Sequence, residues 1–395
     1  MIQYENDMNP ALCNVKPSGI RKFFSIAEEM DNVISLGVGE PDFLTPWHIR
    51  REGIDSLDRG ATRYTANAGL LSLRQEICAF YARRYHLQYR AENQVLVTVG
   101  GSEGIDMAIR TLVCPGDEVL VVEPSFVCYK PLVEVSGGVA VPLVTKEEDN
   151  FRLTAAALEA AITPKTKLLV FPYPNNPTGA VMRREDLESI CRVLQKHKIY
   201  VLSDEIYSEL TYGGADHTSI AAMPGMAERT VVINGFSKTY SMTGWRLGYT
   251  IAPPEITDRI KKVHDFLTVG AAAPLQEAVI PGLRFGQEYY NDLLATYTRK
   301  RDLFVEGLDA IGLQHTVPQG AYYILMDISE FGFDSDLEFC EVLARDVGVG
   351  AVPGSSFFRE PVNHLIRFHF AKRDETLCAA LNRLETIRKK IPARR

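Results

Sequence analysis

The residues with the clearest chemical potential lie between Asn234 and Tyr249, in the stretch NGFSKTYSMTGWRLGY. A predicted strand ends at Asn234, small residues surround a single lysine, Lys238, and Arg246 follows eight residues later. A lysine attacks a carbonyl group only after it loses its proton, so it needs a desolvated position and a nearby positive charge. This pattern predicts that Lys238 is a covalent nucleophile, whereas an ordinary loop lysine is solvated and protonated.

Two further charged residues stand on a predicted strand or directly after one. Asp204 follows the apolar strand Tyr200–Ser203, at the carboxyl edge of the sheet where open α/β sheets bind ligands. Its alternative role is to cap the helix that comes next. Arg367 lies between Ile366 and Phe368, where a buried guanidinium is costly unless it meets an anion. That anion is either a ligand or a structural carboxylate.

A glycine-rich turn precedes a predicted helix at Gly100–Glu103. The free backbone N–H groups at such a helix start, together with the Ser102 hydroxyl, form a cradle for phosphate. Arg246 would add a bidentate contact to the same phosphate. Glycine-rich turns are common, and GGSEG lacks the G-x-G-x-x-G spacing of a dinucleotide-binding domain.

The lysine segment resembles the signature of class I and II aminotransferases, which have fold type I and use pyridoxal 5′-phosphate (PLP). Eight more stretches match this family in the expected order. An ordered set of this kind is far more specific than any one of its members. The stretches are LGVGEPDF (Leu36–Phe43), TRYTANAG (Thr62–Gly69), TVGGSEG (Thr98–Gly104), EPSFVCY (Glu123–Tyr129), PNNPTG (Pro174–Gly179), SDEIY (Ser203–Tyr207), PGSSF (Pro353–Phe357) and LIRFHFA (Leu365–Ala371).

The resemblance implies that an amino group moves between an L-amino acid and a 2-oxo acid such as 2-oxoglutarate, by a ping-pong mechanism. Lys238 would carry PLP as a Schiff base and then move the substrate's α-proton as general acid and base. Asp204 would hold the pyridinium N–H and so keep the ring an electron sink. Tyr207 and Asn176 would donate hydrogen bonds to the ring's phenolate oxygen, although a turn role is the alternative for Asn176.

Other positions take their roles from the same resemblance. Phe126 would stack on the pyridine ring, with a core aromatic as the alternative. Arg367 would grip the substrate α-carboxylate beside the backbone of Gly39, and Asn176 would also face the substrate. Tyr64 would reach the phosphate from the neighbouring subunit of a homodimer. The phosphate cradle would comprise Gly101, Ser102, Glu103 and Arg246.

One position departs from the family pattern. Relatives often place a serine at the position of Gly235, where its hydroxyl binds phosphate. Glycine removes that contact, and Ser237 is the available substitute.

The elements that must position these residues form an α/β fold, because short β-branched runs alternate with helical periodicity from Asn93 to about Ala252. We expect a mostly parallel seven-stranded sheet in a large domain and a smaller α+β domain. The domain boundaries would be an N-terminal segment 1–45 docked on the small domain, a PLP-binding domain 46–285 and a small domain 286–395. The expected strands of the large domain are Gln94–Val99, Glu118–Val122, Val139–Val144, Lys167–Phe171, Tyr200–Ser203, Thr230–Asn234 and Arg246–Ile251; those of the small domain are Ala321–Met326, Val349–Val352 and Leu365–Phe370. The expected helices include Arg184–His197, Glu255–Pro281, Gln287–Ile311, Asp336–Asp346 and Arg373–Lys390.

Composition excludes several classes of protein. The 395 residues carry a net charge of −7, which would repel a nucleic acid backbone. Seven cysteines without a C-x-x-C pair and eight histidines without ligand spacing indicate neither disulfides nor a metal site. No apolar run approaches the ~18 residues that span a bilayer, and Met1–Pro10 lacks the pattern of a targeting signal. We therefore expect a cytoplasmic enzyme.

The substrate is less well defined than the reaction. The stretch SGIRKFF (Ser18–Phe24) resembles aromatic and broad-range aminotransferases, which places an uncharged side-chain pocket near Ile20 and Phe23. Aspartate and N-acetyl-diaminopimelate aminotransferases belong to the same branch, and a fold type I C–S β-lyase would share the cofactor residues. A ligand-sensing domain of a transcription regulator would need a DNA-binding module, and the residues before Leu36 show no helix-turn-helix pattern.

Overall fold

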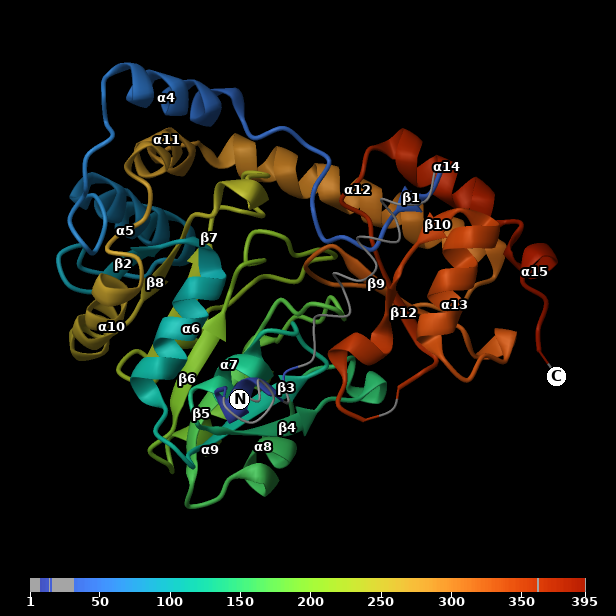
Figure 1. The fold of residues 1–395 in the computed structure, drawn as a ribbon, viewed down its shortest axis with the longest axis horizontal. Coiled ribbons are helices and arrows are strands. Elements are labelled where there is room, and N and C mark those ends of the chain that lie inside the picture. Colours follow the sequence, from blue (N-terminus) through green and yellow to red (C-terminus); the bar gives the residue numbers. More distant parts are fainter. Residues whose placement is uncertain (1–7, 14, 16–31, 361, 395) are drawn as a thin grey trace, which may run out of the picture.

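The computed structural model of the protein describes residues 8–13, 15, 32–360 and 362–394. Figure 1 shows two parts, with the long helix α12 (Gln287–Ile311) running along both. We call the part from α4 to α11 the large lobe. The part from α12 to α15, together with β1, is the small lobe. Within the described residues, no helix is both long and apolar enough to cross a membrane.

A seven-stranded sheet forms the centre of the large lobe, in the order β2-β8-β7-β6-β5-β3-β4. β8 runs antiparallel to both neighbours, and the other pairs are parallel. This confirms the predicted fold class. The strands are β2 (Val95–Thr98), β3 (Glu118–Glu123), β4 (Val139–Val144), β5 (Thr166–Phe171), β6 (Tyr200–Asp204), β7 (Thr230–Gly235) and β8 (Gly248–Ile251).

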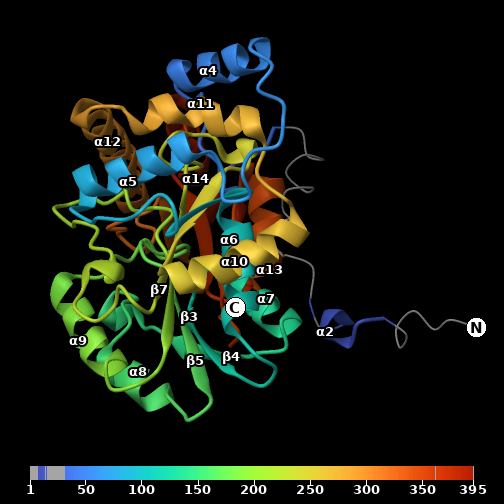
Figure 2. The same cartoon turned by 90° about the vertical axis from the view of Figure 1, so that its left-hand side faces the viewer.

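Helices cover both faces of this sheet, which is why its strands are nearly continuous apolar runs. Successive strand residues point to opposite faces, so Val231 packs in the cluster under α6, α7 and α10, while Val232 packs in the cluster under α5 and α11. Figure 2 shows these helices from the side. The described α-helices that precede α12 are α2 (Pro10–Cys13), α4 (Trp47–Asp58), α5 (Leu71–Tyr85), α6 (Gly100–Leu112), α7 (Tyr129–Val135), α8 (Ala155–Ala161), α9 (Arg184–Leu194), α10 (Pro254–Leu267) and α11 (Ala273–Leu283).

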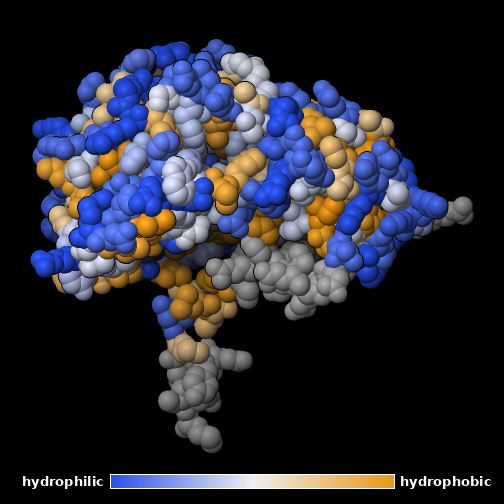
Figure 3. Space-filling view, turned by 90° about the horizontal axis from the view of Figure 1, so that it is seen from above, coloured by the Kyte–Doolittle hydropathy of each residue, from blue (hydrophilic) through white to orange (hydrophobic). Residues whose placement is uncertain are grey.

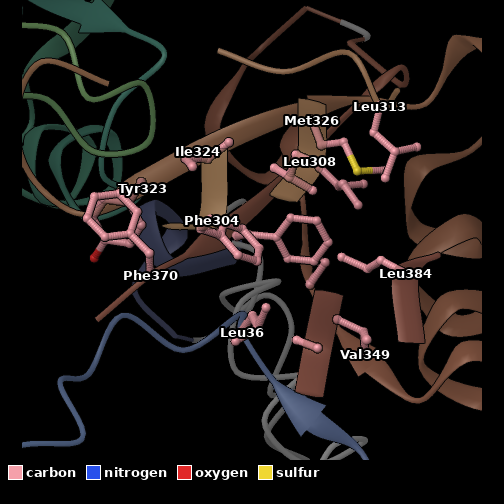
Figure 4. Close-up of a cluster of buried hydrophobic side chains, with 14 of the residues drawn as sticks. Leu36, Phe304, Leu308, Leu313, Tyr323, Ile324, Met326, Val349, Phe370 and Leu384 are labelled. Carbon is pink, nitrogen blue, oxygen red and sulfur yellow. The ribbon is translucent and has the colours of Figure 1, made fainter. Parts of the chain in front are cut away.

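The small lobe has its own core around an antiparallel sheet of order β11-β12-β9. Phe304 and Leu308 of α12 pack there against strand residues such as Ile324 and Met326, as Figure 4 shows. β1 pairs with β10 in parallel, which attaches residues 34–35 to this lobe. The elements are β1 (Ile34–Ser35), β9 (Tyr323–Asp327), α13 (Asp336–Val342), β10 (Val349–Gly350), β11 (Val352–Pro353), β12 (Leu365–His369), α14 (Asp374–Leu384) and α15 (Ile387–Lys390).

Several predicted bounds are wrong for local reasons. The stretch Glu255–Pro281 forms two helices, because Val269 has a left-handed φ of 66° that α-helices exclude. The strand predicted from Arg246 begins at Gly248, because Arg246 is left-handed too, with φ 54°. The strand Val349–Val352 divides between two sheets, β10 and β11. The predicted helix Arg373–Lys390 likewise divides into α14 and α15.

The division of the chain into domains remains a prediction. The proposed boundary at residue 285 falls in the short connection between α11 and α12. Among the described residues of the N-terminal segment, Ile34 and Ser35 form β1, which pairs with β10 of the small lobe.

Candidate active site

A cavity of about 290 Å³ lies beyond the carboxyl end of β6, between the two lobes. Open α/β sheets bind ligands at this edge. The cavity brings together all the predicted site residues except Glu103 and Tyr64. The predicted site residues that line the cavity are Gly39, Gly101, Ser102, Phe126, Asn176, Asp204, Tyr207, Ser237, Lys238, Arg246 and Arg367.

Lys238 lies in the turn after β7 and points into the cavity. Its Nζ donates a hydrogen bond to the Gly39 carbonyl at 3.1 Å and lies 5.7 Å from the centre of the Tyr207 ring. Burial lowers the pKa of Lys238 to about 8; the positive charges of Arg367 and Arg246 act in the same direction. The neutral amine, which is the nucleophile, is therefore accessible near neutral pH.

Asp204 ends β6 and is buried at the cavity wall. Its Oδ2 accepts a hydrogen bond from the Tyr129 hydroxyl at 2.8 Å, and its Oδ1 accepts one from the Ile206 N–H at 3.2 Å. Burial raises the pKa of Asp204 to about 6, and the hydrogen bond from Tyr129 opposes that rise. An ionised carboxylate at this position can hold a cationic N–H donor in the cavity.

Tyr207 and Asn176 present hydrogen-bond donors to the cavity. Burial raises the pKa of Tyr207 well above its ordinary value, so its hydroxyl stays protonated beside the Tyr323 hydroxyl at 2.8 Å. The Asn176 Oδ1 accepts a hydrogen bond from Arg367 at 2.7 Å. Because arginine only donates, this bond fixes the amide orientation and leaves the Asn176 Nδ2 for a ligand.

Arg367 is 2% exposed and stands on β12. Its Nη2 donates to the Gly37 carbonyl at 2.6 Å, and its guanidinium lies 4.3 Å from the centre of the Tyr323 ring. The Nε has no hydrogen-bond partner, and among the described residues the guanidinium bonds to an amide oxygen and a backbone carbonyl and to no carboxylate. The structural ion pair considered as an alternative is thus absent from the described chain, and a buried positive charge is left for an anion.

The start of α6 approaches the rest of the site unusually closely. A Cβ at Gly100, where φ is 76°, would lie 2.6 Å from the Arg246 Nη2, and a Cβ at Gly248 would lie 2.8 Å from the Gly101 nitrogen. Only glycine fits at these contacts. The first N–H groups of α6 have no acceptor within the helix, so they and Arg246 form one anion-binding corner.

Comparison with known proteins identifies the family. The profile of "Aminotransferase class I and II" matches residues 31–384. The chain belongs to this family. This aminotransferase is 47% identical to the putative aminotransferase YugH of Bacillus subtilis, with 94% of this chain and 95% of that protein covered. It is also 38% identical to the aromatic-amino-acid aminotransferase 2 of Thermococcus litoralis, over 95% of this chain and 96% of that one.

A solved structure has the same fold. The methionine aminotransferase YbdL of Escherichia coli superposes with a TM-score of 0.92 at 33% identity, covering 96% of this chain and 99% of that one. The chain is therefore a fold type I aminotransferase that transfers an amino group between an amino acid and a 2-oxo acid.

Class I and II aminotransferases depend on PLP, and the cavity of this aminotransferase has complementary groups for it. Asp204 would face the ring nitrogen, Tyr207 and Asn176 the ring hydroxyl, and the α6 corner the phosphate. The hydrogen-bonding groups of Asp204, Tyr207 and Asn176 and the glycine contacts at the corner are the observations that support this fit. When bound, PLP supplies an aldehyde for covalent attachment and a ring that withdraws electrons from the substrate's α-carbon.

Two predicted cofactor residues lie outside the cavity of this aminotransferase. The Glu103 carboxylate accepts a hydrogen bond from the Val99 N–H at 2.5 Å and another from the Thr268 hydroxyl. Its side chain thus ties the start of α6 to the end of α10. The contact of its backbone N–H with a phosphate stays a prediction. Tyr64 is 91% exposed on this chain.

The structure explains the glycine at position 235. A Cβ there would lie 3.1 Å from the Gly248 Cα and 3.2 Å from the Leu247 carbonyl oxygen, so a serine would require its neighbours to move. Ser237 lines the cavity instead. The predicted side-chain pocket at Ile20 and Phe23 lies outside the described residues.

Sequence reasoning missed seven described residues that line the cavity. Three of them carry a hydroxyl, namely Tyr129, Thr243 and Tyr323, and the others are Ile105, Pro172, Pro174 and Ile206. Tyr129 ends the motif EPSFVCY, which was an available signal, and Thr243 belongs to the lysine segment. Tyr323 carries no local signal, since an aromatic residue at the start of a strand is ordinary.

The pKa of Lys238 gives a direct test on the enzyme freed of PLP. Because burial favours the neutral amine, labelling of Lys238 by a small acylating reagent should rise with a midpoint near pH 8. Mass spectrometry of the Lys238 peptide measures this rate, with the exposed Lys262 of α10 as the internal reference. A midpoint at pH 10 or above would contradict the desolvated amine.

Proposed function

We propose that Lys238 is the covalent anchor of PLP and the residue that moves the substrate's α-proton. The observation that carries this proposal is the meeting of three groups in one cavity: the amine of Lys238, the carboxylate of Asp204 and the incompletely partnered guanidinium of Arg367. One group attaches the cofactor, one fixes its ring and one binds a carboxylate. This combination suits the α-carbon chemistry of amino acids.

In this proposal each residue acts on a defined atom. Arg367 binds the α-carboxylate that all amino-acid and 2-oxo-acid substrates share, which places the α-carbon near Lys238. The amine of Lys238, released when the substrate's amino group replaces it, takes the α-proton as general base and returns a proton as general acid. Its lowered pKa suits both roles near neutral pH.

We propose an aromatic or broad-range amino donor. The cations of the described cavity wall are Lys238, Arg246 and Arg367, and each already has a role above. Apolar side chains of the same wall include Ile105, Phe126 and Ile206. The name of the Thermococcus relative points the same way, while relatives named for aspartate and N-acetyl-LL-diaminopimelate mark the alternatives. For the acceptor, we propose a 2-oxo acid such as 2-oxoglutarate.

We propose that the working unit is a homodimer in which Tyr64 reaches the phosphate of the neighbouring site. Tyr64 and Phe266 are more than 90% exposed, which is unusual for aromatic side chains. Trp47 of α4 is also exposed, and Figure 3 shows hydrophobic residues among the polar ones on the side of the molecule that carries α4. A second copy of the chain would cover such residues.

We also propose a cytoplasmic location. The thiols of Cys78, Cys128, Cys191 and Cys340 form no disulfide. Free thiols of this number suit a reducing compartment.

The covalent anchor can be tested by reduction. Borohydride treatment of the PLP-loaded enzyme should fix a phosphopyridoxyl label on the peptide that contains Lys238, because reduction makes the attachment permanent. Peptide mapping locates the label, and Lys262→Ala should retain it as a control. A label on another lysine would overturn the assignment.

The shared site can be tested by mixing two impaired variants. Hybrids of Lys238→Ala and Tyr64→Ala chains should recover up to roughly a quarter of wild-type activity, because half of randomly assorted dimers contain one intact site. Mixing Lys238→Ala with Arg367→Ala is the matched control. Those two residues line the same cavity of one chain, so that mixture should recover nothing. Failure of the first mixture, with subunit exchange demonstrated, would exclude the shared site.

The two levels of substrate recognition should separate kinetically. Arg367→Ala should lower kcat/KM by roughly two to three orders of magnitude for every amino donor, because a charged contact to a common carboxylate is lost. Initial rates with phenylalanine, tyrosine and aspartate against 2-oxoglutarate measure this. Wild-type preference for aspartate over both aromatic donors would refute the aromatic proposal, and a loss confined to one donor would refute the role of Arg367.

A further inference from the structure

Tyr129 connects two parts of the site that the proposed function treats separately. It begins α7 and is 2% exposed, and its hydroxyl donates a hydrogen bond to the Asp204 Oδ2 at 2.8 Å. Its ring meets the Phe126 ring edge to face, with 6.1 Å between the centres. The Oδ1 of Asp204 is held by the Ile206 N–H. A carboxylate has about four acceptor positions, so capacity remains for a cationic donor from the cavity.

The hydroxyl of Tyr129 stabilises negative charge on Asp204, in surroundings that disfavour such a charge. Asp204 is buried, and the next residue, Glu205, is a second buried carboxylate. The side chains of Ser219 and His217 contact Glu205 at 2.7 Å and 3.0 Å, so its charge is held in place beside Asp204. Burial raises the pKa of Asp204 and the neighbouring Glu205 adds to that rise, whereas Tyr129 supplies the side-chain donor that favours the ionised form of Asp204.

The donor role of Tyr129 is stable across the useful pH range. Burial raises the pKa of Tyr129 well above its ordinary value, and the negative charge of Asp204 adds to the rise. The phenol therefore keeps its proton and can only donate toward the carboxylate.

We propose that Tyr129 is a positioning residue that keeps Asp204 ionised and oriented toward the ring nitrogen of PLP, and thereby sets the strength of that contact. The inference rests on the proposed function, in which Asp204 faces the ring nitrogen. Tyr129 acts through Asp204 and takes no part in proton transfer to the substrate.

The test compares two ligands on enzyme freed of cofactor. One is PLP, and the other is its 1-deaza analogue, in which a C–H group replaces the ring nitrogen. The ratio of their dissociation constants, measured by fluorescence titration, isolates the contact at that nitrogen, because both ligands share the phosphate and the aldehyde. In the wild type PLP should bind more tightly. In Tyr129→Phe the preference for PLP should fall roughly ten-fold, with the affinity for the analogue unchanged.

A second arm follows the same ratio with pH. The preference for PLP should fade as pH drops through the pKa of Asp204 near 6, and in Tyr129→Phe this loss should move about one unit higher, because a hydrogen bond to the charged form has been removed. The other ionisable groups that face Asp204 are Glu205, Lys238 and Cys128. These groups are the same in the wild type and in Tyr129→Phe, so they do not produce a difference between the two pH profiles.

Two controls separate positioning from packing. Tyr173→Phe removes another buried hydroxyl, which bonds the Phe151 carbonyl and the Leu153 N–H, and should leave the ratio unchanged. In an Asp204→Asn background, Tyr129→Phe should also leave the ratio unchanged, because the carboxylate through which it acts is gone.

Each outcome bears on one proposal. A wild type that does not distinguish the two ligands would sink the proposed role of Asp204 itself. A wild type that prefers PLP and a Tyr129→Phe variant with the same preference would overturn the role of Tyr129 alone. Equal losses of affinity for both ligands in Tyr129→Phe would likewise overturn it, since they would indicate that the ring of Tyr129 matters only for packing against Phe126.

Discussion

Four of the described charged side chains line one cavity, and three of them, Lys238, Asp204 and Arg367, are largely desolvated. Within the described chain no ion pair neutralises any of these three. Lys238 bonds to a backbone carbonyl, Asp204 to a phenol and an amide, and Arg367 to an amide oxygen and a carbonyl. Buried charge held only by dipoles is costly. The cavity therefore suits a ligand with a cationic ring, a phosphate and a carboxylate. The rest of the fold holds the charged side chains apart, so that they do not form direct salt bridges with one another.

The two lobes meet this requirement in different ways. The large lobe buries both faces of its sheet, so the ends of β6 and β7 are fixed and present Asp204 and Lys238 from a rigid edge. The small lobe contributes Arg367 from β12, in the middle of an antiparallel sheet with its own core. The packing of each lobe thus limits the side-chain freedom that would otherwise let opposite charges meet.

Site residues could be predicted where their position depends on neighbouring residues in the sequence, such as the end of an apolar strand. Lys238 and Asp204 follow strands that are apolar on both faces, so their position at the sheet edge could be derived. The direction of a side chain at a helix start could not be derived, and the Glu103 carboxylate bonds to the Val99 N–H and the Thr268 hydroxyl. Tyr323 is an ordinary aromatic in the sequence, and the bond of Tyr129 to Asp204 arises only when distant segments pack. Backbone conformations at Val269 and Arg246 escaped prediction because left-handed geometry is imposed by tertiary contacts on residues that disfavour it.

The carbonyl of Gly39 has a consequence for motion between the lobes. It accepts hydrogen bonds from the Lys238 Nζ of the large lobe and from the Tyr322 hydroxyl of the small lobe, at 3.1 Å and 2.9 Å. A side chain on Gly39 would overlap the Tyr323 hydroxyl, so this backbone atom can sit where both donors reach it. Hydrogen bonds weaken beyond about 3.5 Å, so a sliding of the lobes by less than the width of an atom removes one donor. The hydrogen bond that holds the Lys238 amine therefore depends on the relative position of the two lobes, through this single peptide oxygen.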